Sequence, residues 1–300
     1  MASKKNALTI GIEYALAKAI VGILRFTPTS VAFPVARMGA AVLRAAVPKL
    51  AKTARRNLEF AYPELTEADR TRLIHGIFGG LARSLVVFSK FPALNARNIG
   101  QWIRYEGLEH YASAKAKGKG VLVATAHLGN WELSAFAHAL MTEPMHVMVR
   151  PLDNPLIDRL VEHRRLLSGN RLLLKKEVAL SVVRALKQNE AVGILIDQNA
   201  APEEGVFIDF FAKKACAGSA FAKLAARTGA PVIPGFAVWE EPEKKYVLRF
   251  FPELKMTGDT QSDTQTIHAE FEQIIRRYPD QWMWIHRRWK NRPPGEPPLY

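Results

Sequence analysis

The stretch Val121–Leu140, VLVATAHLGNWELSAFAHAL, constrains the fold of this chain most strongly. Its first six residues are largely apolar and predict a buried strand, a tight turn follows at residues 127–130, and the apolar spacing is helical from Trp131 onward. Asn130 has the side chain of a helix N-cap. A buried strand that passes through a short turn into a helix is the building unit of an α/β fold.

Two side chains suited to proton transfer lie in this segment, His127 and Glu132. If both were helical they would point about 140° apart and would not meet. They meet if His127 ends the strand and Glu132 lies in the first helical turn, beside the positive end of the helix dipole, where α/β proteins commonly bind ligands. We interpret the pair as a candidate base with its acidic partner. The alternative is a hydrogen-bonded histidine next to a helix-capping acid.

From about residue 102, short apolar runs alternate with helical patterns. The expected strands are 121–126, 145–150, 192–197, 206–211, 231–239 and 246–251, and the expected helices are 131–140, 154–167, 177–189, 216–229 and 262–277. This alternation predicts an α/β domain over residues 51–300 with a mixed, largely parallel sheet flanked by helices. Residues 51–101 form its helical lead-in, and residues 262–300 form its C-terminal helix and tail.

Residues 1–50 are apolar and basic, and predict membrane-associated helices. Residues 1–60 contain ten Lys or Arg but only two acids, a net charge of +8. Glu13 and Lys18 interrupt the first apolar run, and a charge at the centre of a spanning helix costs about 3 kcal/mol, which makes that run a marginal transmembrane segment. The alternative is amphipathic helices packed on a core. Lys4 and Lys5 predict that the bulk of the chain faces the cytoplasm.

The net charge of +14 calls for an anionic partner, which nucleic acid, an acidic membrane surface or an acidic carrier protein would each supply. A second basic cluster, RRWKNR, occupies residues 287–292. The aromatic residues of WMWIHRRW alternate too regularly with apolar ones for an exposed stacking platform, so no nucleic acid is expected. The single cysteine, Cys216, fits a reducing compartment, and its alanine-rich surroundings suggest a small buried residue of a helix.

Polar side chains also follow two other predicted strands. Arg150 closes the run MHVMVR, and Asp197 closes VGILID and is followed by Gln198. The helix expected after Arg150 carries Arg164 and Arg165. A planar guanidinium makes paired hydrogen bonds to phosphate or carboxylate groups, so these arginines are candidate substrate ligands. The alternatives are surface ion pairs for the arginines and a capping role for the carboxylate.

Several other chemistries lack their motifs. The sequence has no glycine-rich phosphate loop followed by Lys and Ser or Thr, no GxGxxG fingerprint after a strand and no HExxH metal motif. Ser219 lacks the second glycine of a nucleophile elbow. A His–acid pair without a nucleophile suits a base that removes a proton from a substrate hydroxyl, which then attacks an activated acyl group.

The pattern of a histidine, four intervening residues and an acid, placed between a strand and a helix, resembles the signature of glycerolipid acyltransferases. VRPLDNPLIDRL, the strand end at Asp197, GVFIDFFAKKACAGSAFAKLAARTGAPVIPGF and QWMWIHRRWKNRPPGEPP make the resemblance more specific. Together they are similar to the late acyltransferases of lipid A biosynthesis, the lauroyl/myristoyl transferase family. The resemblance runs from about residue 10 to the C-terminus.

The resemblance implies an enzyme of the inner membrane whose active site faces the cytoplasm. It would transfer a fatty acyl group from acyl-carrier protein or coenzyme A to a hydroxyl of an anionic membrane glycolipid, with no further cofactor and no metal. Other acceptors in this group of enzymes are mannolipids and lysophospholipids. The two rivals are a hydrolase and a basic membrane- or nucleic-acid-binding protein without catalysis.

Carried over to this chain, the resemblance makes His127 the catalytic base and Glu132 the acid that orients it. Arg164 would stabilise the substrate phosphate or the oxyanion. The expected substrate-binding residues are Asn130, Arg150, Arg165, Asp197 and Gln198. Many members carry a second acid two positions after the one that Asp197 matches, whereas this chain has Asn199 there.

Overall fold

The computed structural model describes residues 6–174 and 178–300. The N-terminal basic residues Lys4 and Lys5 therefore lie outside the described residues, as does Glu177 at the start of the helix expected over 177–189. The α-helices of the described part are α1 Ala7–Phe26, α2 Thr29–Ala46, α3 Pro48–Ala61, α4 Glu67–Lys90, α5 Leu108–Lys115, α6 Trp131–Met141, α7 Pro155–Leu166, α8 Val178–Lys187, α9 Ala220–Thr228 and α10 Thr260–Arg277.

The strands of the described part form a seven-stranded sheet and a separate hairpin. They are β1 Ile103–Glu106, β2 Val121–Thr125, β3 His146–Val149, β4 Arg171–Leu174, β5 Ala191–Leu195, β6 Gly205–Phe210, β7 Lys213–Gly218, β8 Val232–Glu240 and β9 Lys245–Phe250. The order in the sheet is β1-β9-β8-β2-β5-β3-β4, and each neighbouring pair is parallel except β8 and β9. The predicted α/β class with a mixed, largely parallel sheet is confirmed.

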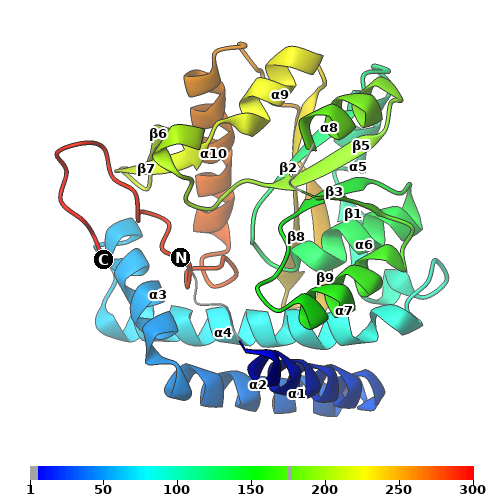
Figure 1. Ribbon diagram of the computed structural model, residues 1–300, viewed down its shortest axis with the longest axis vertical. Coiled ribbons are helices and arrows are strands. Elements are labelled where there is room, and N and C mark those ends of the chain that lie inside the picture. Colours follow the sequence, from blue (N-terminus) through cyan, green and yellow to red (C-terminus); the bar gives the residue numbers. More distant parts are fainter. Residues whose placement is uncertain (1–5, 175–177) are drawn as a thin grey trace.

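Helices cover both faces of the sheet (Figure 1). In β2, Val121 and Val123 pack in one core with α5 and α6, while Leu122 and Ala124 pack in the other with α8, α9 and α10. This alternation follows from the two-residue period of a strand. Because both faces are buried, the strand is apolar along its whole length, as is usual for a parallel sheet.

The helix predicted over 216–229 is wrong in its first part. Residues up to Gly218 belong to β7, which pairs antiparallel with β6, and helix α9 begins only at Ala220. Cys216 is therefore a buried strand residue. Helix propensities differ by less than about 1 kcal/mol per residue, so pairing with an apolar partner strand overrides an alanine-rich composition. The short strands β1 and β4 were also outside the predicted set.

The N-terminal helices α1 and α2 lie along one side of the molecule, at the bottom of Figure 1. Helix α1 packs on α4 and α7, and α2 packs on α4. By length and composition, α1 and the stretch Glu67–Ala93 that contains α4 are apolar enough to cross a membrane, and α2 with α3 forms a further such pair bent by 89°. Large apolar side chains of α1 and α2 are exposed: Leu8, Ile12, Leu16, Ile23, Phe26, Met38 and Val42. Such a face suits contact with lipid.

The C-terminal segment after α10 packs into the domain without regular structure. Trp282, Trp284 and Trp289 are buried, as expected for aromatics that do not form a stacking platform. Arg288 of the second basic cluster is also fully buried and donates from Nη1 to the carbonyl oxygen of Cys216. This segment brings Trp282 beneath the C-terminal edge of the sheet, where it contacts the site described below.

Candidate active site

The turn between β2 and α6 has the conformation that the sequence predicts. Gly129 adopts φ +64°, and a Cβ there would lie 2.0 Å from the carbonyl oxygen of Ala237, so only glycine fits. Asn130 caps α6, with its Oδ1 accepting from the backbone N–H of Leu133 at 3.0 Å. Since this capping side chain is 1% exposed and does not line the cavity described below, its position gives no support to the predicted substrate contact.

The side chains of His127 and Asp197 meet at the C-terminal edge of the sheet. Thr125 and Leu195 are paired in the register of β2 and β5, and each functional residue lies two positions beyond its strand. His127 Nδ1 is 2.8 Å from Asp197 Oδ1, and the backbone N–H of His127 donates to Oδ2 at 3.0 Å. The parallel register of two neighbouring strands thus assembles the pair.

Asp197 is held by a third donor, Trp282, whose Nε1–H donates to Oδ2 at 2.7 Å. The carboxylate side chain is only 3% exposed. Its burial raises the pKa, but the electrostatic interaction with His127 and the hydrogen bonds from His127 and Trp282 outweigh burial and lower the pKa of Asp197 to about 2. The site therefore keeps Asp197 ionised and fixed against the imidazole.

Glu132 does not orient His127, contrary to the sequence expectation. Its two oxygens accept a paired interaction from Arg165 of α7, at 2.8 Å from Nε and 2.5 Å from Nη2. A guanidinium matches a carboxylate with two parallel hydrogen bonds, and Asp197 already occupies the Nδ1 side of His127. The predicted His127–Glu132 hydrogen bond is therefore replaced by two separate pairs, His127–Asp197 and Glu132–Arg165.

Arg164 does not line the cavity described below, so its position gives no support to its predicted role at the oxyanion. Its guanidinium is buried against α4 and donates from Nη1 to the carbonyl oxygens of Phe88 and Ser89, at 3.3 and 3.1 Å. Neighbouring residues on a helix point about 100° apart, so when Arg165 faces the cavity its neighbour faces α4. The sequence spacing does not distinguish the two.

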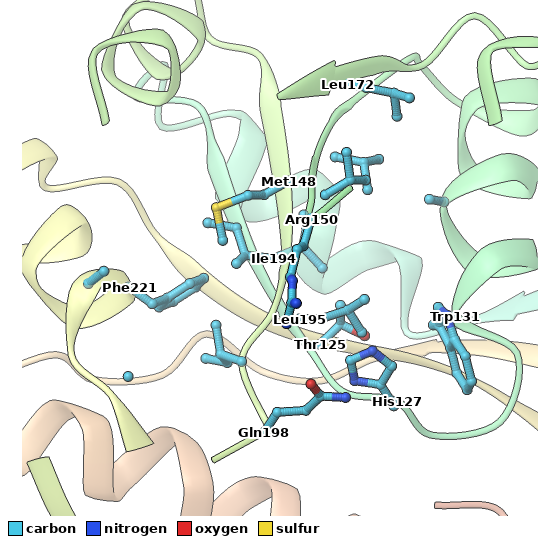
Figure 2. A pocket seen from close by; sticks show the side chains of 18 of the residues that line it. Thr125, His127, Trp131, Met148, Arg150, Leu172, Ile194, Leu195, Gln198 and Phe221 are labelled. Atoms are coloured by element: carbon cyan, nitrogen blue, oxygen red, sulfur yellow. The ribbon is translucent and has the colours of Figure 1, made fainter. Parts of the chain in front are cut away.

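A cavity of about 1020 Å³ opens beside His127. It penetrates the sheet between β5 and β3, which pair only at His146–Val192 and Val147–Gly193 and then separate. Figure 2 shows Phe221, Met148 and Ile194 towards one face of the sheet at this split, and Leu172 and Trp131 towards the other. The lining is mostly apolar. Its polar members near the histidine include Glu132, Arg150, Arg165 and Gln198.

The predicted site residues thus fall into three groups. His127, Glu132, Arg150, Arg165 and Gln198 line the cavity, Asp197 lies behind the histidine, and Asn130 and Arg164 serve the scaffold. Sequence reasoning missed Trp282 as a donor to Asp197, because 85 positions separate the two and no spacing links them. No group of three or more His, Cys, Asp or Glu side chains that would hold a metal ion gathers in the described part of the chain.

A histidine held by a buried carboxylate at the edge of a deep apolar cavity fits an enzyme that uses a general base on a substrate with a long apolar part. The comparisons make this class specific. The chain belongs to the bacterial lipid A biosynthesis acyltransferase family, whose sequence profile matches residues 2–291. The resemblance drawn from the sequence is confirmed, and the protein is an O-acyltransferase.

Relatives of this chain carry the same family description. It is 32% identical over 254 residues to the lipid A biosynthesis lauroyltransferase of Escherichia coli (strain K12), covering 83% of this chain and 82% of that protein. It is 29% identical to the palmitoleoyltransferase of the same organism, covering 82% and 81%. It is 26% identical to a lipid A biosynthesis acyltransferase of Haemophilus influenzae, covering 81% and 76%.

Proposed function

We propose that this protein transfers a fatty acyl chain from an acyl thioester, carried by acyl-carrier protein or coenzyme A, to a hydroxyl group of a lipid A precursor. The observation that carries the proposal is the His127–Asp197 pair at the edge of the apolar cavity. The names of the relatives support lipid A as the acceptor class. Mannolipids and lysophospholipids are the alternative acceptors.

In the proposed reaction His127 is the general base. Asp197 accepts the Nδ1–H of the imidazole, which leaves Nε2 on the other side of the ring for the acceptor hydroxyl. Nε2 takes the hydroxyl proton as the oxygen attacks the thioester carbonyl. The tetrahedral intermediate then collapses, its C–S bond breaks, and the departing thiolate takes the proton from His127. Asp197 stays ionised throughout and stabilises the imidazolium.

Charge on the tetrahedral intermediate needs a donor other than Arg164. The carboxamide of Gln198 lies beside the His127 ring in Figure 2 and lines the cavity. We assign it, with the N-terminal amides of α6, to stabilisation of the oxyanion. Arg150, whose side chain is 83% exposed at the cavity, would meet an anionic group of the acceptor. The Glu132–Arg165 pair would hydrogen-bond the acceptor's polar headgroup.

The membrane would deliver the acceptor. The exposed apolar faces of α1 and α2 support contact with a bilayer, and the excess of basic residues over the first 60 positions supports an anionic surface. The proposed location is the inner membrane with the site on the cytoplasmic side, where acyl-carrier protein and coenzyme A thioesters are available. The burial of Trp282, Trp284 and Trp289 argues against a nucleic-acid platform built on these rings.

The test is transfer by the purified protein in detergent micelles, with an acyl thioester donor and a lipid A precursor as acceptor. Mass spectrometry should detect the acceptor heavier by one acyl group, and free fatty acid reports hydrolysis. His127→Ala should lower the rate by about a hundred- to ten-thousand-fold, because it removes the base. Wild-type rates in this variant would contradict the mechanism. Fatty acid release without acylated lipid would make the protein a hydrolase.

A further inference from the structure

Residues from both faces of the sheet line the cavity. On one face of the sheet it extends past Trp131 to the loop that begins at Arg150. That loop lies next to α1, since Nδ2 of Asn154 donates to the carbonyl oxygen of Ile10 at 3.0 Å. On the other face the cavity runs along α9 and passes Ala179 of α8. In Figure 1, α8 and α9 lie at the top of the molecule and α1 and α2 at the bottom.

Two exposed basic side chains, Lys223 and Arg227, line the cavity on the α9 side. They are four residues apart on one helix and therefore lie on the same face of it. Neither forms an ion pair with a carboxylate of the described residues. Glu204 also lines this side of the cavity and interacts with another group. Phe221 and Leu224 form the buried apolar wall next to them. A cationic rim above an apolar passage fits a ligand with an anionic head and a long neutral arm.

Direct transfer requires that two substrates reach the cavity. Without an acyl-enzyme, the donor thioester and the acceptor hydroxyl must occupy the cavity together with His127. One substrate is a membrane lipid that arrives from the side of α1 and α2. The other is water-soluble, and Lys223 and Arg227 line the cavity along α9, which lies on the opposite side of the molecule from those helices (Figure 1).

We propose that Lys223 and Arg227 bind the phosphate of the 4′-phosphopantetheine arm of the donor, which enters between α8 and α9. This inference rests on the proposed function and adds the route of the donor. The arm has about thirteen bonds from phosphorus to sulfur and extends to about 16 Å at about 1.25 Å per bond. The run from Arg227 to Ala220 covers about 10 Å along α9, so the thioester reaches beyond the start of that helix towards His127. The acyl chain then crosses the split between β5 and β3.

The experiment compares three donors of the same acyl chain: acyl-carrier protein, acyl-coenzyme A and phosphate-free acyl-pantetheine. In the double variant Lys223→Ala/Arg227→Ala, the KM of both phosphate-bearing donors should rise about tenfold or more, because charged hydrogen bonds are lost. The KM of acyl-pantetheine, the KM of the acceptor and kcat should stay unchanged. In the wild-type protein, the lower KM of acyl-carrier protein or of acyl-coenzyme A identifies which of the two supplies the phosphopantetheine. Lys223→Arg should keep most of the donor affinity.

A matched control removes the same charge from the neighbouring helix. Arg184 and Lys187 of α8 are exposed and do not line the cavity, so Arg184→Ala/Lys187→Ala should leave the KM of acyl-coenzyme A within about twofold, as expected for distant surface charges. Three results would overturn the inference: an unchanged KM for both phosphate-bearing donors in the α9 variant, a raised KM for the acceptor instead, or an effect confined to acyl-carrier protein, which would mean contact with the carrier surface. If the wild-type protein transferred no acyl group, the proposed function itself would fail.

Discussion

The substitution Asp197→Asn tests whether Asp197, and not Glu132, is the acid that orients His127. The carboxylate accepts three hydrogen bonds: Oδ1 faces His127 Nδ1, and Oδ2 accepts from the backbone N–H of His127 and from Trp282 Nε1. An asparagine in the same place has one oxygen and one NH₂ group. Its oxygen should take the Oδ2 position, because the opposite orientation leaves two buried N–H donors without an acceptor, at about 1–3 kcal/mol each.

That orientation changes the tautomer of the histidine. The NH₂ group of the asparagine then faces Nδ1 and donates to it, so the imidazole proton moves to Nε2. An Nε2–H cannot remove a proton from the acceptor hydroxyl. In the Ser–His–Asp triad the equivalent change lowers kcat by about 10⁴-fold, and we expect a loss of similar size here.

The assay is kcat with both substrates saturating, alongside the thermal midpoint and the ¹⁵N NMR shifts of the His127 ring. Glu132→Gln is the control, because it leaves the three donors of Asp197 in place and should keep the proton on Nδ1. The reasoning is refuted if Asp197→Asn stays within about tenfold of the wild-type kcat, a loss too small for an absent general base. It is also refuted if Glu132→Gln moves the ring proton to Nε2.

Three further predictions concern stability, chain length and membrane contact. Because the pKa of Asp197 is lowered from 3.8 to about 2, its ionised form stabilises the fold above about pH 4. About 2 kcal/mol of the free energy of unfolding should be lost as the pH falls from there through 2, and the acid unfolding of Asp197→Asn should lack this loss. At Gly193 a Cβ would lie 3.0 Å from Cε of Met145, so Gly193→Val should shorten the preferred acyl chain by about two carbons and Met145→Ala should lengthen it. Competition among donors of different length measures this preference. Leu224→Ala on the other face should leave the preferred chain length unchanged, because the chain ends at Met145. Leu16→Glu, on the exposed face of α1, should reduce co-sedimentation with anionic vesicles, and unchanged binding would exclude α1 as a membrane contact.

The sequence by itself determined the features that depend on neighbouring residues. The two-residue and 3.6-residue periods placed β2 and α6, and Asn130 was recognisable as the N-cap between them. The position of Asp197 at a strand end was also readable from its local pattern. The apolar, basic composition of the first 50 residues marked the helices whose faces are exposed.

Only the tertiary structure decided which side chains meet. β2 and β5 are adjacent, so His127 and Asp197 come together across 70 positions, and the C-terminal segment then adds Trp282. The packing of α7 decided that Arg165, and not Arg164, faces the cavity. Periodicity reports which face of an element is buried, whereas the order of strands and the packing of helices depend on contacts between distant residues. For this reason the histidine of the candidate site was identifiable from the sequence, and its acidic partner was not.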